Sequence, residues 1–206
     1  ERRAEEAALE AYLGQMTTLL LEKSLSDATP EDPVRAVARA WTFTVLRRVS
    51  GERKGVLLRF LRESSLIAAR NPIVALTRAD LAGADLQNAN LVAVNLTVVD
   101  LTAANLRGSG LQYADLTGAS LRDVNLQYTD LRGANLRYTD LRGANLRGAN
   151  LQYVNLEYAD LTGANLRDAA YNSRTVWPID FNFEQAGVIE GPIKFRTDDA
   201  AGPGVK

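Results

Sequence analysis

The stretch DLRGANLRYTDLRGANLRGANLQ, residues 130–152, places a leucine at every fifth position. The same spacing continues without a gap from Leu81 to Leu166, which gives 18 leucines in residues 79–168. The residue two positions before each leucine is small, and the residue directly before it is Asp or Asn in 16 of the 18 units. Residues 79–168 are therefore a tandem repeat of five residues, and this repeat decides the fold.

A period of five residues fits neither a single helix nor a single strand. On an α-helix, successive leucines would be about 140° apart around the axis, and on one flat strand they would alternate between its two faces. A single apolar interior results if the chain turns a corner in each unit, with the leucine and the small residue pointing inward. Gly after the leucine and Asp or Asn before it suit such turns. The pattern predicts a solenoid.

The motif A-(D/N)-L-x-x, as in ADLAGADLQNANL at residues 79–91, resembles the pentapeptide-repeat proteins. The resemblance implies a mainly β fold, a right-handed quadrilateral β-helix with four units per coil and about 4.5 coils. We place this β-helix at residues 73–170, after an N-terminal helical region at 1–72 and before a C-terminal cap and loose tail at 171–206. The interior leucine ladder comprises Leu81, Leu86, Leu91, Leu96, Leu101, Leu106, Leu111, Leu116, Leu121, Leu126, Leu131, Leu136, Leu141, Leu146, Leu151, Leu156, Leu161 and Leu166.

With 20 residues per coil, outward residues 20 apart should form columns. Tyr138 and Tyr158 then stack on one face, while Tyr113 and Tyr153 share another face two coils apart. These side chains can keep the rod soluble and cover its backbone, or they can form a surface for a partner protein. The candidate partner surface comprises Tyr113, Tyr128, Tyr138, Tyr153, Tyr158, Arg107, Arg147 and Arg167.

An acidic column suggests an alternative function. It comprises Asp80, Asp100, Ser120, Asp140 and Asp160. Some pentapeptide-repeat proteins that protect DNA gyrase are thought to imitate duplex DNA, and the resemblance implies this alternative, a DNA-mimic inhibitor or protector of a type II topoisomerase. However, the repeat region holds seven arginines beside ten acidic residues, and arginines disrupt a phosphate-like potential. We therefore favour the interpretation that Asp and Asn before leucine are turn formers.

The sequence of the N-terminal region predicts three helices. The first spans about Glu5 to Lys23, and the second begins with Asp32 as cap and Pro33 in its first turn and ends at Gly51. The third carries Leu57, Phe60 and Leu61 and stops at Arg70–Pro72. A solenoid has an open strand edge at each end, and these helices would cover the first one.

Residues 33–70 hold nine basic residues and two acidic ones. They can pair with the acidic segment 1–32, or they can contact an anionic membrane surface. The candidates for that contact are Arg35, Arg39, Arg47, Arg48, Arg53, Lys54, Arg59 and Arg62. The segments at 8–25 and 34–67 also resemble the helical region of a bacterial pentapeptide subgroup in which membrane-spanning segments often precede it. This resemblance implies a cytoplasmic protein tethered to the inner face of the plasma membrane through a segment before Glu1.

The repeat fails after Leu166, where aromatic residues gather. Trp177, Phe181 and Phe183 form either a cap on the last coil or an aromatic pocket, and a solenoid's need for a terminal cap favours the first interpretation.

The chain contains no His and no Cys, so it lacks the commonest general base and the commonest transition-metal ligands. No apolar run approaches the roughly 18 residues that span a membrane. We predict no catalytic, cofactor-binding or metal-ligating residue, no cofactor and no small-molecule substrate. The predicted function is a non-catalytic scaffold whose partner is another protein, with the membrane surface as a further partner and no direct binding of nucleic acid.

Overall fold

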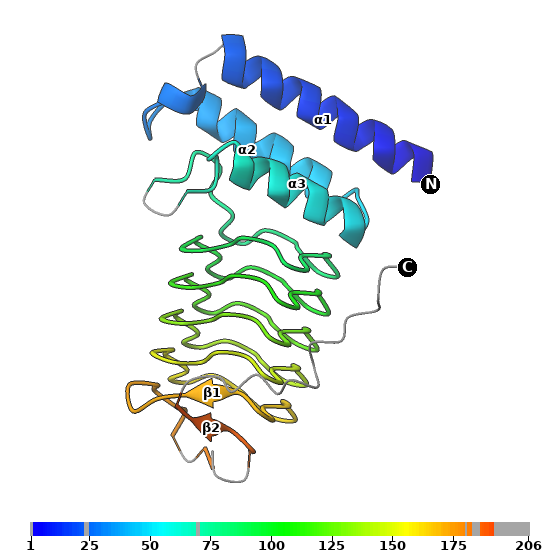
Figure 1. Cartoon of the computed structure of the whole chain (residues 1–206). Helices are drawn as coiled ribbons and strands as arrows, with labels where there is room; N and C mark the ends of the chain where they lie inside the picture. The colour runs from blue at the N-terminus through cyan, green and yellow to red at the C-terminus, as the bar shows by residue number, and fades with distance from the viewer. Residues whose placement is uncertain (1, 23–24, 69–70, 180, 183–185, 192–206) are drawn as a thin grey trace, which may run out of the picture.

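The fold is a straight rod with a bundle of helices stacked on one end (Figure 1). The structure is a computed structural model and describes residues 2–22, 25–68, 71–179, 181–182 and 186–191. The elements in chain order are α1 (Arg2–Glu22), the short 3-10 helix η1 (Leu25–Asp27), α2 (Pro33–Leu46), α3 (Gly51–Glu63), β1 (Ala170–Tyr171) and β2 (Ile189–Glu190). The repeat region lies between α3 and β1.

The rod is built from coils of 20 residues that pair in parallel. On one face of the rod, Asp80 pairs with Asp100 and Asp100 pairs with Ser120. The other three faces show the same pairing of residues 20 apart, as between Asp85 and Asn105. The expected quadrilateral coil is therefore present. The expectation of a mainly β content was wrong in one respect: each unit contributes a single bridged residue rather than a strand. Strands of several paired residues cannot form, because the chain begins a new turn at every fifth residue.

Each corner is a four-residue turn that starts at the leucine. The leucine carbonyl accepts a hydrogen bond from the amide three residues later, as from Ala144 to Leu141 at 3.0 Å. The third residue of the turn has a positive φ, 68° at Gly143, which is why glycine recurs there. All sixteen Asp and Asn residues before a leucine accept a hydrogen bond through Oδ1 from the amide two residues later. These side chains are turn formers.

The interior of the rod is a continuous leucine column. All eighteen leucines of the ladder are buried, and the most exposed of them, Leu161, shows 8% of its surface. The column also extends one unit further than the repeat pattern indicates, because Leu76 and Val74 are buried in the same way. The sequence pattern missed this unit because Ala75 stands where 16 of the other 18 units carry Asp or Asn.

Helix α3 covers part of the first coil, and two glycines let it approach closely. A Cβ atom on Gly51 would overlap the carbonyl oxygen of Gly83, and one on Gly55 would overlap that of Asp85. The amide of Asp85 donates to the Gly51 carbonyl at 2.9 Å, so helix and coil share a backbone hydrogen bond. The prediction that Gly51 ends the second helix was wrong, because this glycine begins α3 with Ser50 as its N-cap.

Helix α1 packs across α2 and α3 on the side away from the rod (Figure 1). Asp32 caps α2 by accepting from the amide of Val34 at 3.0 Å, as the sequence predicted. Tyr12 of α1 is buried against α2, where its hydroxyl lies 2.8 Å from that of Thr42. Burial raises the pKa of Tyr12 to about 12. In the part of the chain that the structure describes, we find no helix with the length and apolarity needed to cross a bilayer.

The far end of the rod is closed by aromatic side chains and by the β1–β2 pair. The Trp177 ring stacks on Phe181, with centroids 5.0 Å apart, and both rings pack against the buried core. Asn155 pairs with Val176, so the last coil is one residue longer than the others. The predicted cap residue Phe183 lies outside the described residues.

Candidate protein-interaction faces of the rod

Tyr138 and Tyr158 form an exposed aromatic stack. Their rings are 4.9 Å apart and within 8° of parallel, and they are 56% and 58% exposed. The Arg137 guanidinium lies 5.3 Å from the Tyr138 ring and pairs with Glu157 at 3.0 Å. Val98, two coils earlier in the same column, is also exposed. We call Val98, Arg137, Tyr138, Glu157 and Tyr158 the tyrosine face.

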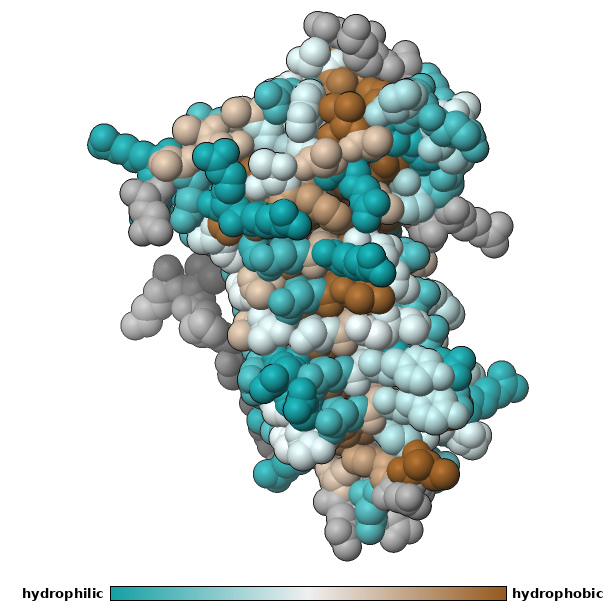
Figure 2. Space-filling view, turned by 180° about the vertical axis from the view of Figure 1, so that it is seen from behind, coloured by the Kyte–Doolittle hydropathy of each residue, from teal (hydrophilic) through white to brown (hydrophobic). Residues whose placement is uncertain are grey.

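Figure 2 shows the rod from behind, with small hydrophobic areas separated by polar side chains. An exposed pair of stacked rings is therefore a distinct feature on a surface that otherwise mixes polar and apolar groups. The adjacent Glu157 carboxylate raises the pKa of the Tyr158 hydroxyl above its ordinary value of 10.

Tyr113 and Tyr153 share a face, but their rings do not meet. The coil between them carries Gly133, and the Tyr113 ring lies over that glycine. Arg174 approaches the Tyr153 ring at 5.7 Å from beyond the repeats. Both rings are more than half exposed, so each presents an isolated aromatic side chain.

Tyr128 and the predicted arginines are more occupied by contacts within the rod. Arg107 lies 5.0 Å from the Tyr128 ring and donates to the Gln127 amide oxygen at 3.1 Å. Arg147 and Arg167 both approach the Asp168 carboxylate, at 3.4 and 3.9 Å. This column therefore offers less free charge to a partner than the sequence indicated.

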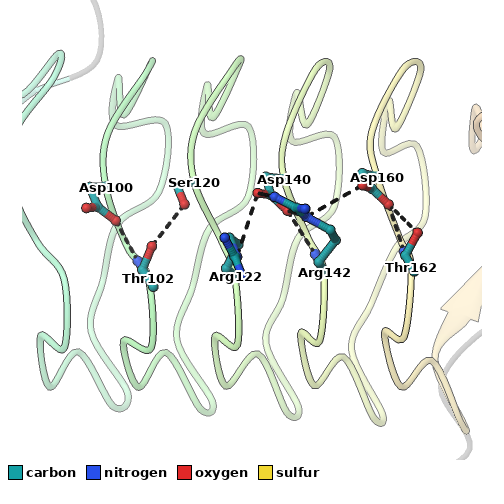
Figure 3. Close-up of polar contacts among 8 residues, drawn as sticks. All are labelled: Asp100, Thr102, Ser120, Arg122, Asp140, Arg142, Asp160 and Thr162. Atoms are coloured by element: carbon teal, nitrogen blue, oxygen red, sulfur yellow. Dashed lines mark hydrogen bonds and ion pairs between the residues drawn. The ribbon is translucent and has the colours of Figure 1, made fainter.

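The acidic column is largely neutralised (Figure 3). Arg142 lies between two aspartates, 2.6 Å from Asp140 and 3.6 Å from Asp160, and Arg122 approaches Asp140 at 3.9 Å. At the helical end, Lys54 binds Asp80 at 2.8 Å. Cations thus lie beside three of the four carboxylates of this column, which is unlike the unbroken negative charge of a DNA backbone.

These pairs also hold the aspartates in their ionised form. The hydrogen bond from Arg142 lowers the pKa of Asp140, and the hydrogen bond from the Thr162 hydroxyl lowers that of Asp160. Neither carboxyl is suited to act as a proton donor near neutral pH. Among the described residues, no group of three or more acidic side chains could hold a metal ion.

Four of the eight basic residues predicted for an anionic surface have hydrogen-bond or ion-pair partners within the protein. Arg35 is buried and donates to the Asn71 carbonyl at 3.0 Å, and Arg39 donates to that of Thr77 at 3.2 Å. Arg53 pairs with Glu5 of α1 at 2.9 Å. Lys54 is buried and also donates to the Ala82 carbonyl at 3.0 Å. These cations join the helices to each other and to the rod.

The other four are Arg47, Arg48, Arg59 and Arg62, and three of them line two separate hollows. Arg48 lies in a groove of about 210 Å³ between α1 and α2. Arg59 and Arg62 line a larger cleft of about 550 Å³ between α3 and residues 85–91 of the first coil. The sequence alone could not have revealed this cleft, because it depends on how α3 crosses the coil.

A family model of five-residue repeats matches the part of the chain that forms the coils. The family model "Pentapeptide repeats (8 copies)" matches residues 75–109, 100–137 and 129–168. No curated protein matches the chain.

Several solved structures are similar. The pentapeptide repeat protein alr5209 from Nostoc PCC 7120 is 37% identical, over 56% of this chain and 86% of its own length, with a TM-score of 0.33. HetL from Nostoc sp. strain PCC 7120, involved in heterocyst differentiation regulation, is 34% identical over 47% of this chain and 61% of its own length, with a TM-score of 0.26. QnrB1, a plasmid-mediated fluoroquinolone resistance protein, is 16% identical over 54% of this chain and 67% of its own length, with a TM-score of 0.34. The repeated five-residue unit, its 20-residue coils and these matches together show that the chain belongs to the pentapeptide-repeat family.

Proposed function

We propose that this protein is a non-catalytic binding module that takes a partner protein on its tyrosine face. The observation that carries this proposal is the stack of Tyr138 on Tyr158, in which both rings remain more than half exposed. Tyr is enriched in protein interfaces, and large aromatic side chains supply much of their binding energy.

The stack is preorganised for binding. Each ring is held by its neighbour and by Arg137, on backbone that is fixed by hydrogen bonds to the coils on both sides. A partner would therefore lose little free energy in ordering these side chains. Arg137 and Glu157 add one charge of each sign beside the rings, which favours a partner with complementary polar groups at the edge of an apolar contact.

Imitation of DNA is the weaker proposal. The paired charges on the acidic face reduce the potential that a topoisomerase would recognise. A gyrase supercoiling assay separates the two proposals. A DNA mimic would inhibit supercoiling or protect against a quinolone at micromolar protein or below, and a binding module for another partner would do neither.

Recruitment to an anionic membrane is also weaker, because three of the four arginines that remain available are split between two hollows. Tethering to the cytoplasmic face of the plasma membrane stays a prediction. Sedimentation with phosphatidylserine vesicles at low and high salt tests the contact through these arginines.

The tyrosine face is tested with a double variant, Tyr138→Ala with Tyr158→Ala. Proteins retained from a lysate of the native cell by the immobilised wild type are compared with those retained by this variant. Tyr113→Ala is the control, because Tyr113 is even more exposed, at 71%, but lies in another column. We expect a partner that the wild type and Tyr113→Ala retain and that the double variant loses by at least tenfold. Equal retention by all three proteins, with unchanged melting temperatures, would overturn the proposal.

A further inference from the structure

The cleft between α3 and the first coil exposes a backbone edge. Its coil side is formed by residues 85–91, and its helix side by Gly55, Leu58, Arg59, Arg62 and Glu63. A volume of about 550 Å³ lies within the range of ligand-binding sites in proteins. The cleft lies at the helical end of the rod, away from the stacked tyrosines, and is independent of the proposed function.

The hydrogen-bond pattern of the rod shows which groups of this edge lack partners. In a later coil, the amide before the leucine donates to the preceding coil, as from Gly110 to the Ala89 carbonyl at 2.9 Å. In the first coil, α3 provides this partner only for Asp85, through the Gly51 carbonyl. Among the described residues, no hydrogen bond is made by the Asn90 amide or accepted by the carbonyls of Gln87 and Asn90.

Charge on the helix side indicates the chemistry of an occupant. Within the described part of the chain, the guanidinium groups of Arg59 and Arg62 have no acidic partner and donate no hydrogen bond. Two acidic side chains, Glu63 and Asp85, also line the cleft. Asp85 Oδ1 already accepts from the Gln87 amide at 3.3 Å and from Asn105 Nδ2 at 3.2 Å. Among the described lining residues, this leaves one carboxylate without a partner, that of Glu63, beside two guanidinium groups without partners.

We propose that this cleft binds an extended acidic segment of a partner protein. The segment pairs with the backbone of Gln87 and Asn90 as an added strand, and its carboxylates contact Arg59 and Arg62. An open strand edge is a template for such pairing. A helix or a free phosphate would leave the backbone groups unsatisfied, and a basic segment would leave both arginines unpaired.

The probe is a fluorescein-labelled hexapeptide of alternating Glu and Val, acetylated and amidated at its ends. A peptide with Lys in place of Glu, inorganic phosphate and a single-stranded oligonucleotide are the comparison ligands. Fluorescence anisotropy with the full chain should show saturable binding of the acidic peptide, at least tenfold tighter than the Lys peptide. No saturation by 1 mM protein, equal binding of both peptides, or full displacement by millimolar phosphate or by the oligonucleotide would overturn the proposal.

Two sets of variants test the two halves of the contact. Arg59→Glu with Arg62→Glu should weaken binding at least tenfold, while Arg122→Glu on the rod should not. Asn90→Pro removes the free amide, and Asn90→Ala keeps it while losing the same side-chain hydrogen bond to Val92. Binding that is lost in Asn90→Pro and kept in Asn90→Ala, with similar melting temperatures, supports strand pairing. Equal binding by both would contradict it. The Tyr138 and Tyr158 double variant should bind the peptide like the wild type, so this site and the tyrosine face can fail separately.

Discussion

The Tyr113 ring lies over Gly133, one coil further along the rod, where a Cβ atom would come within 2.7 Å of ring carbon Cδ1. The same relationship joins Tyr128 to Gly148, where that distance is also 2.7 Å. Each of these two tyrosines is thus followed by glycine in the next coil of the same column, whereas Tyr138 is followed by Tyr158, which stacks on it.

We predict that Gly133→Ala lowers the free energy of unfolding by about 2–4 kcal/mol. A positive φ of 67° costs an L-residue about 1–2 kcal/mol, and displacing the Tyr113 ring adds about 1–2 kcal/mol more. Urea unfolding followed by circular dichroism measures this loss.

Gly163→Ala is the matched control, because its φ is 71° and the nearest atom to its Cβ would be 3.8 Å away. The Gly163→Ala variant should lose only the part of the unfolding free energy that comes from the positive φ, about 1–2 kcal/mol. In a Tyr113→Ala background, Gly133→Ala should cost only as much as Gly163→Ala, because the ring that its Cβ would displace is gone. A loss at Gly163 as large as that at Gly133 would show that the ring contact has no energetic role.

A second prediction concerns the contact of α3 with the first coil. Gly55→Ala should destabilise the protein by more than about 2 kcal/mol, because its Cβ would meet the carbonyl of Asp85, which cannot move without breaking the coil. Gly14→Ala in α1 has open space around its Cβ and should stabilise the protein by about 0.5–1 kcal/mol. Thermal unfolding of both variants checks this, and a neutral Gly55→Ala would mean that α3 does not pack on the coil as described.

Acid should weaken the face that carries Asp140. The hydrogen bond from Arg142 lowers the pKa of Asp140 below its ordinary value of 3.8. A lowered native pKa stabilises the fold at pH values above the ordinary pKa, and this contribution disappears as the pH falls through the native pKa. Arg142→Gln should therefore be less stable than the wild type at pH 7, and this difference in stability should become smaller as the pH is lowered to 2. A stability difference that is the same at both pH values would contradict the ion pair.

The interior of the rod could be predicted from the sequence because each unit repeats the same local choices. Leucine, the small residue and the turn residues all favour one coil, so the buried ladder and the Asp and Asn turns follow from residue type and spacing. Leu76 was missed because its unit has the leucine without the turn former before it.

The ends and the outer faces could not be predicted in the same way. A glycine such as Gly51 often marks the end of a helix. Here it is needed because a Cβ atom would overlap the carbonyl oxygen of Gly83, which is distant in sequence. Arg35 and Lys54 belong to a basic segment, yet burial and carbonyl partners in the rod fix their role. These features depend on the orientation of the helices on the coil, which no local pattern encodes.

The central claim is that residues 20 apart lie side by side in adjacent coils. The chain has no cysteine, so an engineered pair reports this directly. Adjacent strands lie about 4.8 Å apart, which is within reach of a disulfide. Arg122→Cys with Arg142→Cys should form an intramolecular disulfide under mild oxidation, whereas Arg122→Cys with Arg132→Cys, two units apart on another face, should not. Peptide mass spectrometry after oxidation gives the yields: a high yield for the first pair alone is the predicted result, and equal yields for the two pairs would contradict the stacked coil.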